Sequence, residues 1–320
     1  MNTFSLRETE PVFDRIRKDP RARVIRNIVL LLLVFVALWI SDVIVQTLGS
    51  IVVMIPKMIA SMATGNPLQP EELNIGMREA LFFTIGCIVV CLIFSLAIER
   101  RKARTLGLTK RHCVRDYLIG AVLGVAMMGA AVMIEWAGGG VRFVEVVKEI
   151  PVVSMIIYFI GWIIQGFSEE LMFRGVYMMS TGTHHKPVTA VVISSVLFAC
   201  AHLGNDGISF FAMVNLILFG VFAAIYFLRT DSIWGIAAIH SMWNAAQGNV
   251  FGFKVSGNEI PETFLRFAQT DGHTWLNGGA FGPEGGAAVT IVLLTGIVIM
   301  FLLPQRKAED AIATQAAAEE

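Results

Sequence analysis

VVSMIIYFIGWIIQGFSEELMFRGVYM, residues 152–178, is an apolar run that carries three charged residues in its second half. A membrane-spanning helix needs about 20 mostly apolar residues, so this run is long enough to cross a bilayer. Ionisable groups at that depth are costly, and they normally face a protein interior or a wet cavity. The alternative is that these groups, Glu169, Glu170 and Arg174, form a solvated flank at the cytoplasmic end of the helix.

The spacing of the three charges separates two roles. Glu170 and Arg174 stand four residues apart, hence on one helical face, where they can form an ion pair. Glu169 is rotated by roughly 100° about the helix axis and is free to point elsewhere. The spacing predicts that one carboxylate has a structural role and that the other takes part directly in the function.

The chain as a whole is strongly apolar. Of its 320 residues, 55% are hydrophobic and 16% are charged, whereas soluble domains are about a quarter charged. The formal net charge is zero, so no overall basic field favours a nucleic-acid partner. We predict an all-α, polytopic transmembrane helical bundle of about eight spans around a polar cavity, with spans near residues 25–49, 79–98, 117–137, 152–178, 188–203, 209–228, 232–250 and 287–303. The first run stays apolar to Met62, past Pro56, which predicts a tilted or broken first helix.

Basic residues in short loops set the orientation of such a bundle. The N-terminal segment and the loop after the second span both carry clusters of Arg and Lys, which places both in the cytoplasm. An even number of spans then returns the C-terminus, with Arg306 and Lys307, to the same side. We therefore predict a multi-pass protein of the plasma (inner) membrane with both termini cytoplasmic.

The spans divide the chain into four parts. They are an N-terminal segment with the first helix (1–78), a core (79–250), an outer loop (251–286), and a last helix with a cytoplasmic tail (287–320). The outer loop is rich in Gly, and its length fits a partly ordered cap as well as a floppy connection.

Two histidines lie inside other apolar segments. His202 follows Phe198 by one helical turn, and His240 shares a helical face with Asn244. Taken singly, each histidine is more typical of a packed core residue than of a catalytic one. Taken together, they stand on different helices from the glutamate pair, as a site assembled between bundle helices requires.

Other polar residues are assigned no role in that site. Glu135 falls at the outer end of the third span and is predicted to be interfacial. Asn215, in the sixth span, is predicted to make contacts between helices. Cys87 and Cys91 are predicted to be packing residues.

The polar residues of the spans form three ordered motifs: Glu169-Glu170-x-x-x-Arg174, Phe198-x-x-x-His202 and His240-x-x-x-Asn244. This ordered set, on successive hydrophobic segments, resembles the CAAX-protease and bacteriocin-processing family, which includes the type II CAAX prenyl endopeptidases. The resemblance covers roughly residues 80–250. It implies an all-helical membrane protease whose catalytic cavity is polar and whose partners are the lipid bilayer and a peptide or protein substrate.

The resemblance also implies residue roles. Glu169 and His202 would hold and activate a water, and His240 and Asn244 would stabilise the oxyanion. The remaining charged residues of the first motif would support that geometry: Glu170 and Arg174. Family members are often described as metalloproteases, which implies a zinc ion held by Glu169, His202 and His240. A glutamate-dependent mechanism without a metal is equally implied, and no HExxH pairing marks a zincin.

Two other functions stay open from the sequence. The same polar residues could serve a proton- or ion-coupled transporter, although no inverted repeat of interrupted helices is seen. The chain could also be a non-catalytic immunity or maturation partner in the membrane. The substrate, its prenylation and the oligomeric state are not specified by the sequence.

One geometric expectation runs against the site. If the fourth span ends near residue 178, Glu169 lies toward the cytoplasmic side, whereas counting from Pro187 puts His202 toward the outer side. At 1.5 Å per residue the difference in depth is on the order of 15 Å. Tilted, unequal or broken helices would have to remove it.

Overall fold

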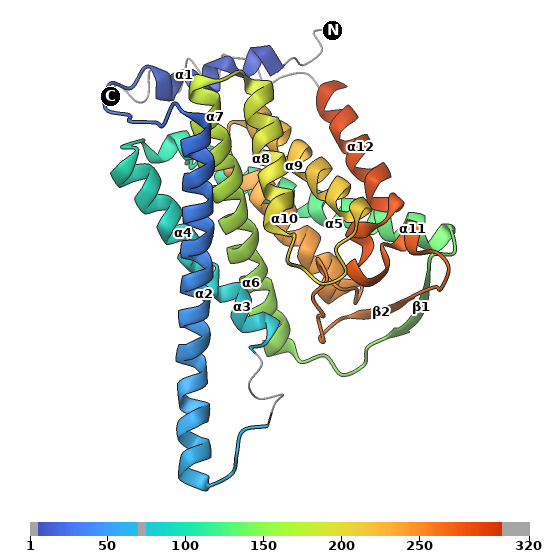
Figure 1. Cartoon of the computed structure of the whole chain (residues 1–320). Helices are drawn as coiled ribbons and strands as arrows, with labels where there is room; N and C mark the ends of the chain where they lie inside the picture. Colours follow the sequence, from blue (N-terminus) through green and yellow to red (C-terminus); the bar gives the residue numbers. More distant parts are fainter. Residues whose placement is uncertain (1–5, 70–74, 303–320) are drawn as a thin grey trace.

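The computed structural model describes residues 6–69 and 75–302, and these residues form a mostly helical bundle (Figure 1). The α-helices are α1 (Glu10–Arg17), α2 (Ile28–Thr64), α3 (Met77–Phe83), α4 (Ile85–Leu92), α5 (Cys113–Ala137), α6 (Val152–Glu170), α7 (Met179–His184), α8 (Pro187–Ala201), α9 (Phe210–Thr230), α10 (Ile233–Ala245), α11 (Thr274–Asn277) and α12 (Ala287–Leu302). Three wide-turn π segments continue α4, α6 and α10: η3 (Ile93–Ile98), η5 (Leu171–Met178) and η6 (Ala246–Val250). Single 3₁₀ turns are η1 (Leu6–Thr9), η4 (Ala103–Leu106), η7 (Gly279–Phe281) and η8 (Pro283–Gly285).

The helices make this a multi-pass membrane protein. Within the described residues, five helical stretches are long and apolar enough to cross a membrane: Ile28–Thr64, Met77–Ile98, Cys113–Ala137, Val152–His184 and Phe210–Thr230. α8 and α12 are shorter apolar helices. Helices therefore stand at all eight segments that the sequence predicts, but length and hydropathy support five spans, and the total of eight stays a prediction. The predicted cytoplasmic tail, residues 303–320 with Arg306 and Lys307, lies outside the described residues.

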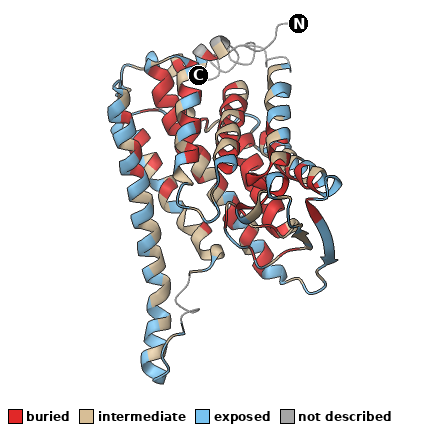
Figure 2. Ribbon diagram, turned by 45° about the vertical axis from the view of Figure 1, so that its right-hand side comes forward, coloured by how far each residue is buried: buried red, intermediate tan, exposed pale blue. Residues whose placement is uncertain are grey.

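The first membrane helix is unbroken. α2 has 37 residues and passes through Pro56 without ending, which at 1.5 Å per residue gives about 55 Å. The hydrocarbon core of a bilayer is about 30 Å thick, and Figure 1 shows the far part of α2 running beyond the other helices. Most of its surface is exposed, unlike the interior helices (Figure 2). The expectation of a break at Pro56 is wrong.

Helix α10, which carries His240 and Asn244, lies directly on α5. The contact is made at Gly120 and Gly124, where an added Cβ would overlap the carbonyl oxygens of Gly235 and Ile239. Small residues four apart let two membrane helices approach to backbone contact. The close approach fixes the depth and rotation of α10.

We expect Gly124→Ala to lower the free energy of unfolding by about 1–3 kcal/mol, because the added methyl must push α10 away from α5. Thermal unfolding of the purified protein in one detergent measures the effect. Gly129→Ala is the matched control on the same helix, since its Cβ would meet only the Phe251 ring at 3.9 Å. Equal melting temperatures for the two variants would contradict this packing.

The outer segment, residues 251–286, forms an ordered cap over the bundle and contributes one strand of a two-stranded sheet. β1 (Val141–Val146) pairs antiparallel with β2 (Leu265–Gln269), with an irregularity between Phe143 and Glu145. The strands were not predicted, because β1 is exposed along almost all of its length and its sequence, VRFVEV, does not alternate cleanly between apolar and polar residues. Asn277 ties the cap to the core by donating to the Gly140 carbonyl at 2.7 Å.

At the opposite end of the bundle, α1 lies across the turn between α7 and α8 (Figure 1). Phe13 of α1 is fully buried against Gly182. Arg17 donates to the carbonyls of Thr183 at 2.8 Å and Gly182 at 2.7 Å. Arg15 also pairs with Asp231, at the turn between α9 and α10. The N-terminal helix therefore holds two interhelical turns in place.

Candidate active site

Glu169 and His202 lie at the same depth. α6, η5 and α7 form one stretch from Val152 to His184, so the fourth helix runs on past residue 178. Glu169 stands 15 residues before His184, and His202 stands 15 residues after Pro187. At 1.5 Å per residue both are about 22 Å from the turn. The expected difference in depth is absent because the fourth helix is longer than its apolar run.

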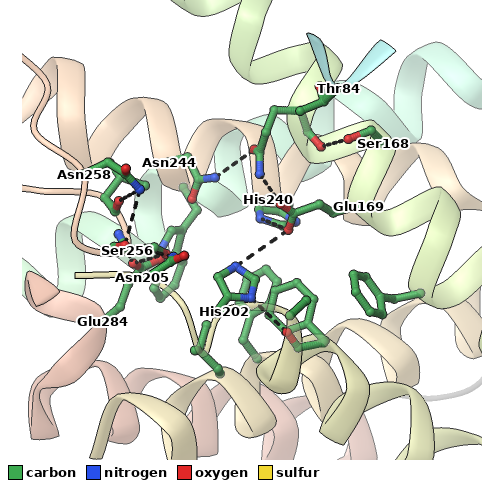
Figure 3. Close-up of a pocket in the computed structure, with 18 of the residues that line it drawn as sticks. Thr84, Ser168, Glu169, His202, Asn205, His240, Asn244, Ser256, Asn258 and Glu284 are labelled. Atoms are coloured by element: carbon green, nitrogen blue, oxygen red, sulfur yellow. Dashed lines mark hydrogen bonds and ion pairs between the residues drawn. The ribbon is translucent and has the colours of Figure 1, made fainter. Parts of the chain in front are cut away.

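Two histidine side chains converge on one carboxyl oxygen of Glu169. Its Oε2 lies 4.0 Å from His202 Nε2 and 3.7 Å from His240 Nε2. Figure 3 shows the three residues turned toward one another from α6, α8 and α10. Oε2 accepts no hydrogen bond from the described residues. Glu169 is 24% exposed, whereas Glu170 is wholly buried.

The partners of the histidines fix which ring nitrogens face Glu169. His202 Nδ1 lies 2.8 Å from the Phe198 carbonyl, and His240 Nδ1 lies 2.9 Å from Glu170 Oε1. A carbonyl and a carboxylate accept hydrogen bonds, so each Nδ1 carries a proton and donates it. In a neutral ring Nε2 is then an acceptor. Three acceptor atoms therefore point at one place.

Glu170 is the structural carboxylate. Its Oε1 accepts from Arg174 Nη1 at 3.0 Å as well as from His240. Both members of the Glu170–Arg174 pair are fully buried. Arg174 also donates to the Gly220 carbonyl at 3.3 Å, and its guanidinium lies 4.8 Å from the centre of the Phe198 ring. The pair thus joins α6, α8, α9 and α10 behind the site.

Gln165 is a site residue that the sequence analysis missed. Its Nε2 donates to Glu169 Oε1 at 2.6 Å, and its Oε1 accepts from Asn244 Nδ2 at 3.0 Å. Gln165 stands one turn before Glu169 on the same helical face, and that spacing was the available signal. Asn244 is connected to Glu169 through this glutamine.

A cavity of about 310 Å³ opens in front of these residues. Its walls come from many parts of the bundle, which include α2, α3, α4, α6, η5, α8, α9, α10, α12 and the outer segment. Figure 3 shows a second polar group on one side of the cavity, which consists of Asn205, Ser256, Asn258 and Glu284. Glu284 Oε2 accepts from the backbone nitrogen of Ser256 at 2.7 Å, and Asn205 donates to the Ser256 carbonyl at 3.0 Å. The turn that follows His202 is therefore fastened to the cap.

Wide helical turns begin inside the first motif and just after the third. η5 follows Glu170, and η6 follows Ala245, one residue after Asn244. Such segments are frequent at functional sites, and they misalign backbone carbonyls. Arg101 satisfies two carbonyls of η5, at Gly175 (2.7 Å) and Val176 (3.5 Å).

Arg101, in the basic loop after the second span, has a structural role. The sequence places it in a basic cytoplasmic cluster, but it is 3% exposed. It pairs with the fully buried Glu99 at 3.0 Å, and both side chains bond to Ser180. Arg101 therefore stabilises, through buried hydrogen bonds, the helix that carries Arg174.

Two further expectations have different outcomes. Glu135, predicted to be interfacial, is fully buried, and its two carboxyl oxygens have no hydrogen-bond partner in residues 6–69 and 75–302. That prediction is wrong, because the cap covers the end of α5. Asn215 does connect elements, as predicted, since it donates to the Glu284 and Gly286 carbonyls and accepts from Thr290 of α12.

The implied zinc site lacks a ligand cluster. Across the part of the chain that the structure describes, no group of three or more His, Cys, Asp or Glu side chains could hold a metal ion. His202 Nε2 and His240 Nε2 lie 4.0 Å and 3.7 Å from Glu169 Oε2. The side chains present supply a base and hydrogen-bond donors, from which the reaction below is derived.

Comparison with known proteins supports the resemblance. Residues 151–246 match the family model described as Rce1-like, type II CAAX prenyl endopeptidase. The matched segment runs from the start of α6 to the end of α10, and it contains all three motifs. No curated protein and no solved structure matches the chain.

Proposed function

From the premise that this chain belongs with the CAAX proteases, we propose that it is an intramembrane endopeptidase that hydrolyses a peptide bond at or near the membrane surface. The observation that carries the proposal is the convergence of Glu169 Oε2 with the Nε2 atoms of His202 and His240 at the wall of a cavity. Acceptors separated by 3.7–4.0 Å favour a bridging donor rather than a direct bond. A water molecule has two protons to donate and a lone pair left for attack.

In the proposed reaction Glu169 is the general base. It takes a proton from water as the water oxygen attacks the scissile carbonyl carbon, and it later returns that proton to the leaving amine nitrogen. His202 Nε2 accepts the second proton of the water as a hydrogen bond and sets its direction. Both carboxyl oxygens of Glu169 are thus in use, since Gln165 holds Oε1.

The oxyanion is assigned to the other side of the site. Asn244 Nδ2 has two protons, and only one is used by Gln165. The second proton is free to donate to the developing negative charge. His240, oriented by Glu170 and Arg174, can donate from Nε2 as well once its ring carries a proton on both nitrogens. Preorganised donors of this kind contribute on the order of 3 kcal/mol each in other acyl-transfer sites.

The clustering of these groups favours hydrolysis over transport. A proton or ion pathway strings polar groups along a route through the membrane, whereas Glu169, His202 and His240 meet at one point. A non-catalytic binding partner would not need three acceptors around one place. Both alternatives are separated from the proposal by the following experiment.

We expect the protein, purified in detergent, to cleave members of a quenched-fluorescence peptide library, and His202→Ala to remove that cleavage. Addition of a metal chelator is expected to leave the rate unchanged, because the proposed chemistry uses side chains alone. Loss of activity in chelator with recovery on adding zinc would contradict the metal-free mechanism. Absence of cleavage combined with proton flux in liposomes would favour the transporter.

We also propose that both termini are cytoplasmic in the plasma (inner) membrane. The support is the gathering of basic residues at the end of the bundle where α1 lies, including Arg15, Arg17 and Lys186. A reporter protein that folds only in the cytoplasm, fused to the N-terminus, is expected to be active. Activity of a periplasmic reporter at the same position would reverse the orientation.

A further inference from the structure

Helix α2 supplies a wall of the cavity from outside the segment 151–246 that matches the family. Trp39, Asp42 and Gln46 line the same cavity as Glu169. They recur at intervals of three and four residues, so they form one stripe along α2. An acidic side chain within an apolar span is costly and calls for a function.

Asp42 is held in place with one oxygen left over. Its Oδ2 accepts from Gln46 Nε2 at 2.8 Å, one turn further along the helix. Its Oδ1 is buried and has no hydrogen-bond partner among the described residues. The glutamine therefore orients the carboxylate, and the free oxygen is an acceptor for a group that enters the cavity.

The charges that line the cavity are of one sign. The lining includes three carboxylates, Asp42, Glu169 and Glu284, and no Lys or Arg among the described residues. Arg174 stands behind the wall, fully buried and bound to Glu170. Carboxylates with no opposing cation attract a positive group and repel a negative one, most strongly where water is scarce.

Trp39 adds a second element of cation recognition. It lies one turn before Asp42 on the same stripe. The face of an indole ring attracts Lys and Arg side chains more strongly than any other aromatic ring does. An indole and a carboxylate one turn apart can receive a single basic side chain.

We propose that Asp42, with Trp39, is a specificity determinant that receives a Lys or Arg side chain of the peptide substrate. The proposal rests on the endopeptidase function and adds a substrate class to it: segments with a basic residue near the scissile bond. The same charges disfavour a free carboxylate beside Asp42.

Two sets of peptides test this preference. The peptides are made in pairs, and the two members of a pair are identical except at one position, which is Lys in one set and norleucine in the other. From pair to pair this position is moved stepwise away from the scissile bond. At one position we expect kcat/KM to favour Lys by about tenfold, the factor that corresponds to 1.4 kcal/mol. In Asp42→Asn, which keeps an acceptor for Gln46, that ratio is expected to fall close to one.

Ser41→Ala is the control on α2, because its hydroxyl bonds to the Ala37 carbonyl and it does not line the cavity. It should keep the wild-type ratio. Asp42→Lys should reverse the preference toward a peptide with Glu at the same position. A ratio near one in the wild type, or a ratio unchanged in Asp42→Asn, would overturn the proposal.

Binding separates this inference from the endopeptidase function. Fluorescence anisotropy of labelled Lys and norleucine peptides with the Glu169→Gln protein is expected to show the same tenfold preference in binding. The double variant that carries Glu169→Gln and Asp42→Asn should show no preference. If no peptide is cleaved but this binding preference is seen, the endopeptidase proposal is refuted and the cation site is supported. If cleavage occurs and neither assay shows a preference, the cation site fails alone.

Discussion

Glu169→Gln is expected to lower kcat for peptide hydrolysis by a factor of about 10²–10⁴, the usual contribution of a positioned general base. The amide keeps the shape of the side chain and can still contact Gln165, but it cannot take a proton from water. KM should change much less, because the peptide is bound by the cavity walls. Initial rates measured over a range of peptide concentrations separate the two effects.

The matched control for Glu169 is Glu145→Gln, on the exposed strand β1. Glu145 pairs with Arg266 at 3.0 Å, and both side chains are about half exposed. This variant should keep the wild-type kcat, since neither residue of the pair lines the cavity. A Glu169→Gln protein that melts at the wild-type temperature and retains wild-type kcat would remove the general base from the account.

Arg174→Met is expected to lower the free energy of unfolding by about 3–5 kcal/mol. The substitution leaves Glu170 buried, facing His240 but without its cationic partner. It also removes the hydrogen bond to the Gly220 carbonyl and the contact with Phe198. The melting temperature in detergent and titration with a denaturing detergent measure the loss.

Two further variants show whether the loss comes from the unpaired charge. Arg174→Met combined with Glu170→Met should recover part of the stability, because an apolar pair leaves no buried charge. Arg266→Met, at the exposed pair on the sheet, should cost less than about 1 kcal/mol. A double variant no more stable than Arg174→Met would mean that the buried charge is not the cause.

The sequence was informative where polar residues interrupt apolar helices. The four-residue interval between Glu170 and Arg174 predicts a shared helical face, and the structure forms that ion pair. The order of the three motifs gave the family resemblance that the match of residues 151–246 supports. Hydropathy located the helices, because each apolar run must bury its backbone polar groups in internal hydrogen bonds.

The end of the fourth helix could not be read from hydropathy. The apolar run stops near residue 178, yet the helix continues to His184. The last turn is covered by α1, since Phe13 packs on Gly182 and Arg17 binds the terminal carbonyls. A contact between segments more than 160 residues apart leaves no local trace in the sequence.

Three other features depend on tertiary contacts in the same way. Glu135 is buried because the cap folds over the end of α5, and Arg101 is buried because η5 offers it free carbonyls. Asp42 could not be identified as a site residue from the sequence, since no neighbouring motif in the apolar run of α2 marks it. The cavity that it lines is formed only when α2 stands across from α6.

The central claim is that a water molecule activated at Glu169 breaks a peptide bond. Cleavage of one peptide substrate in ¹⁸O-labelled water, followed by mass spectrometry of the products, tests it most directly. The account predicts one ¹⁸O atom in the new carboxylate from the wild-type protein and no product from folded Glu169→Gln beyond its residual rate. Labelled product formed equally fast by both proteins would contradict it.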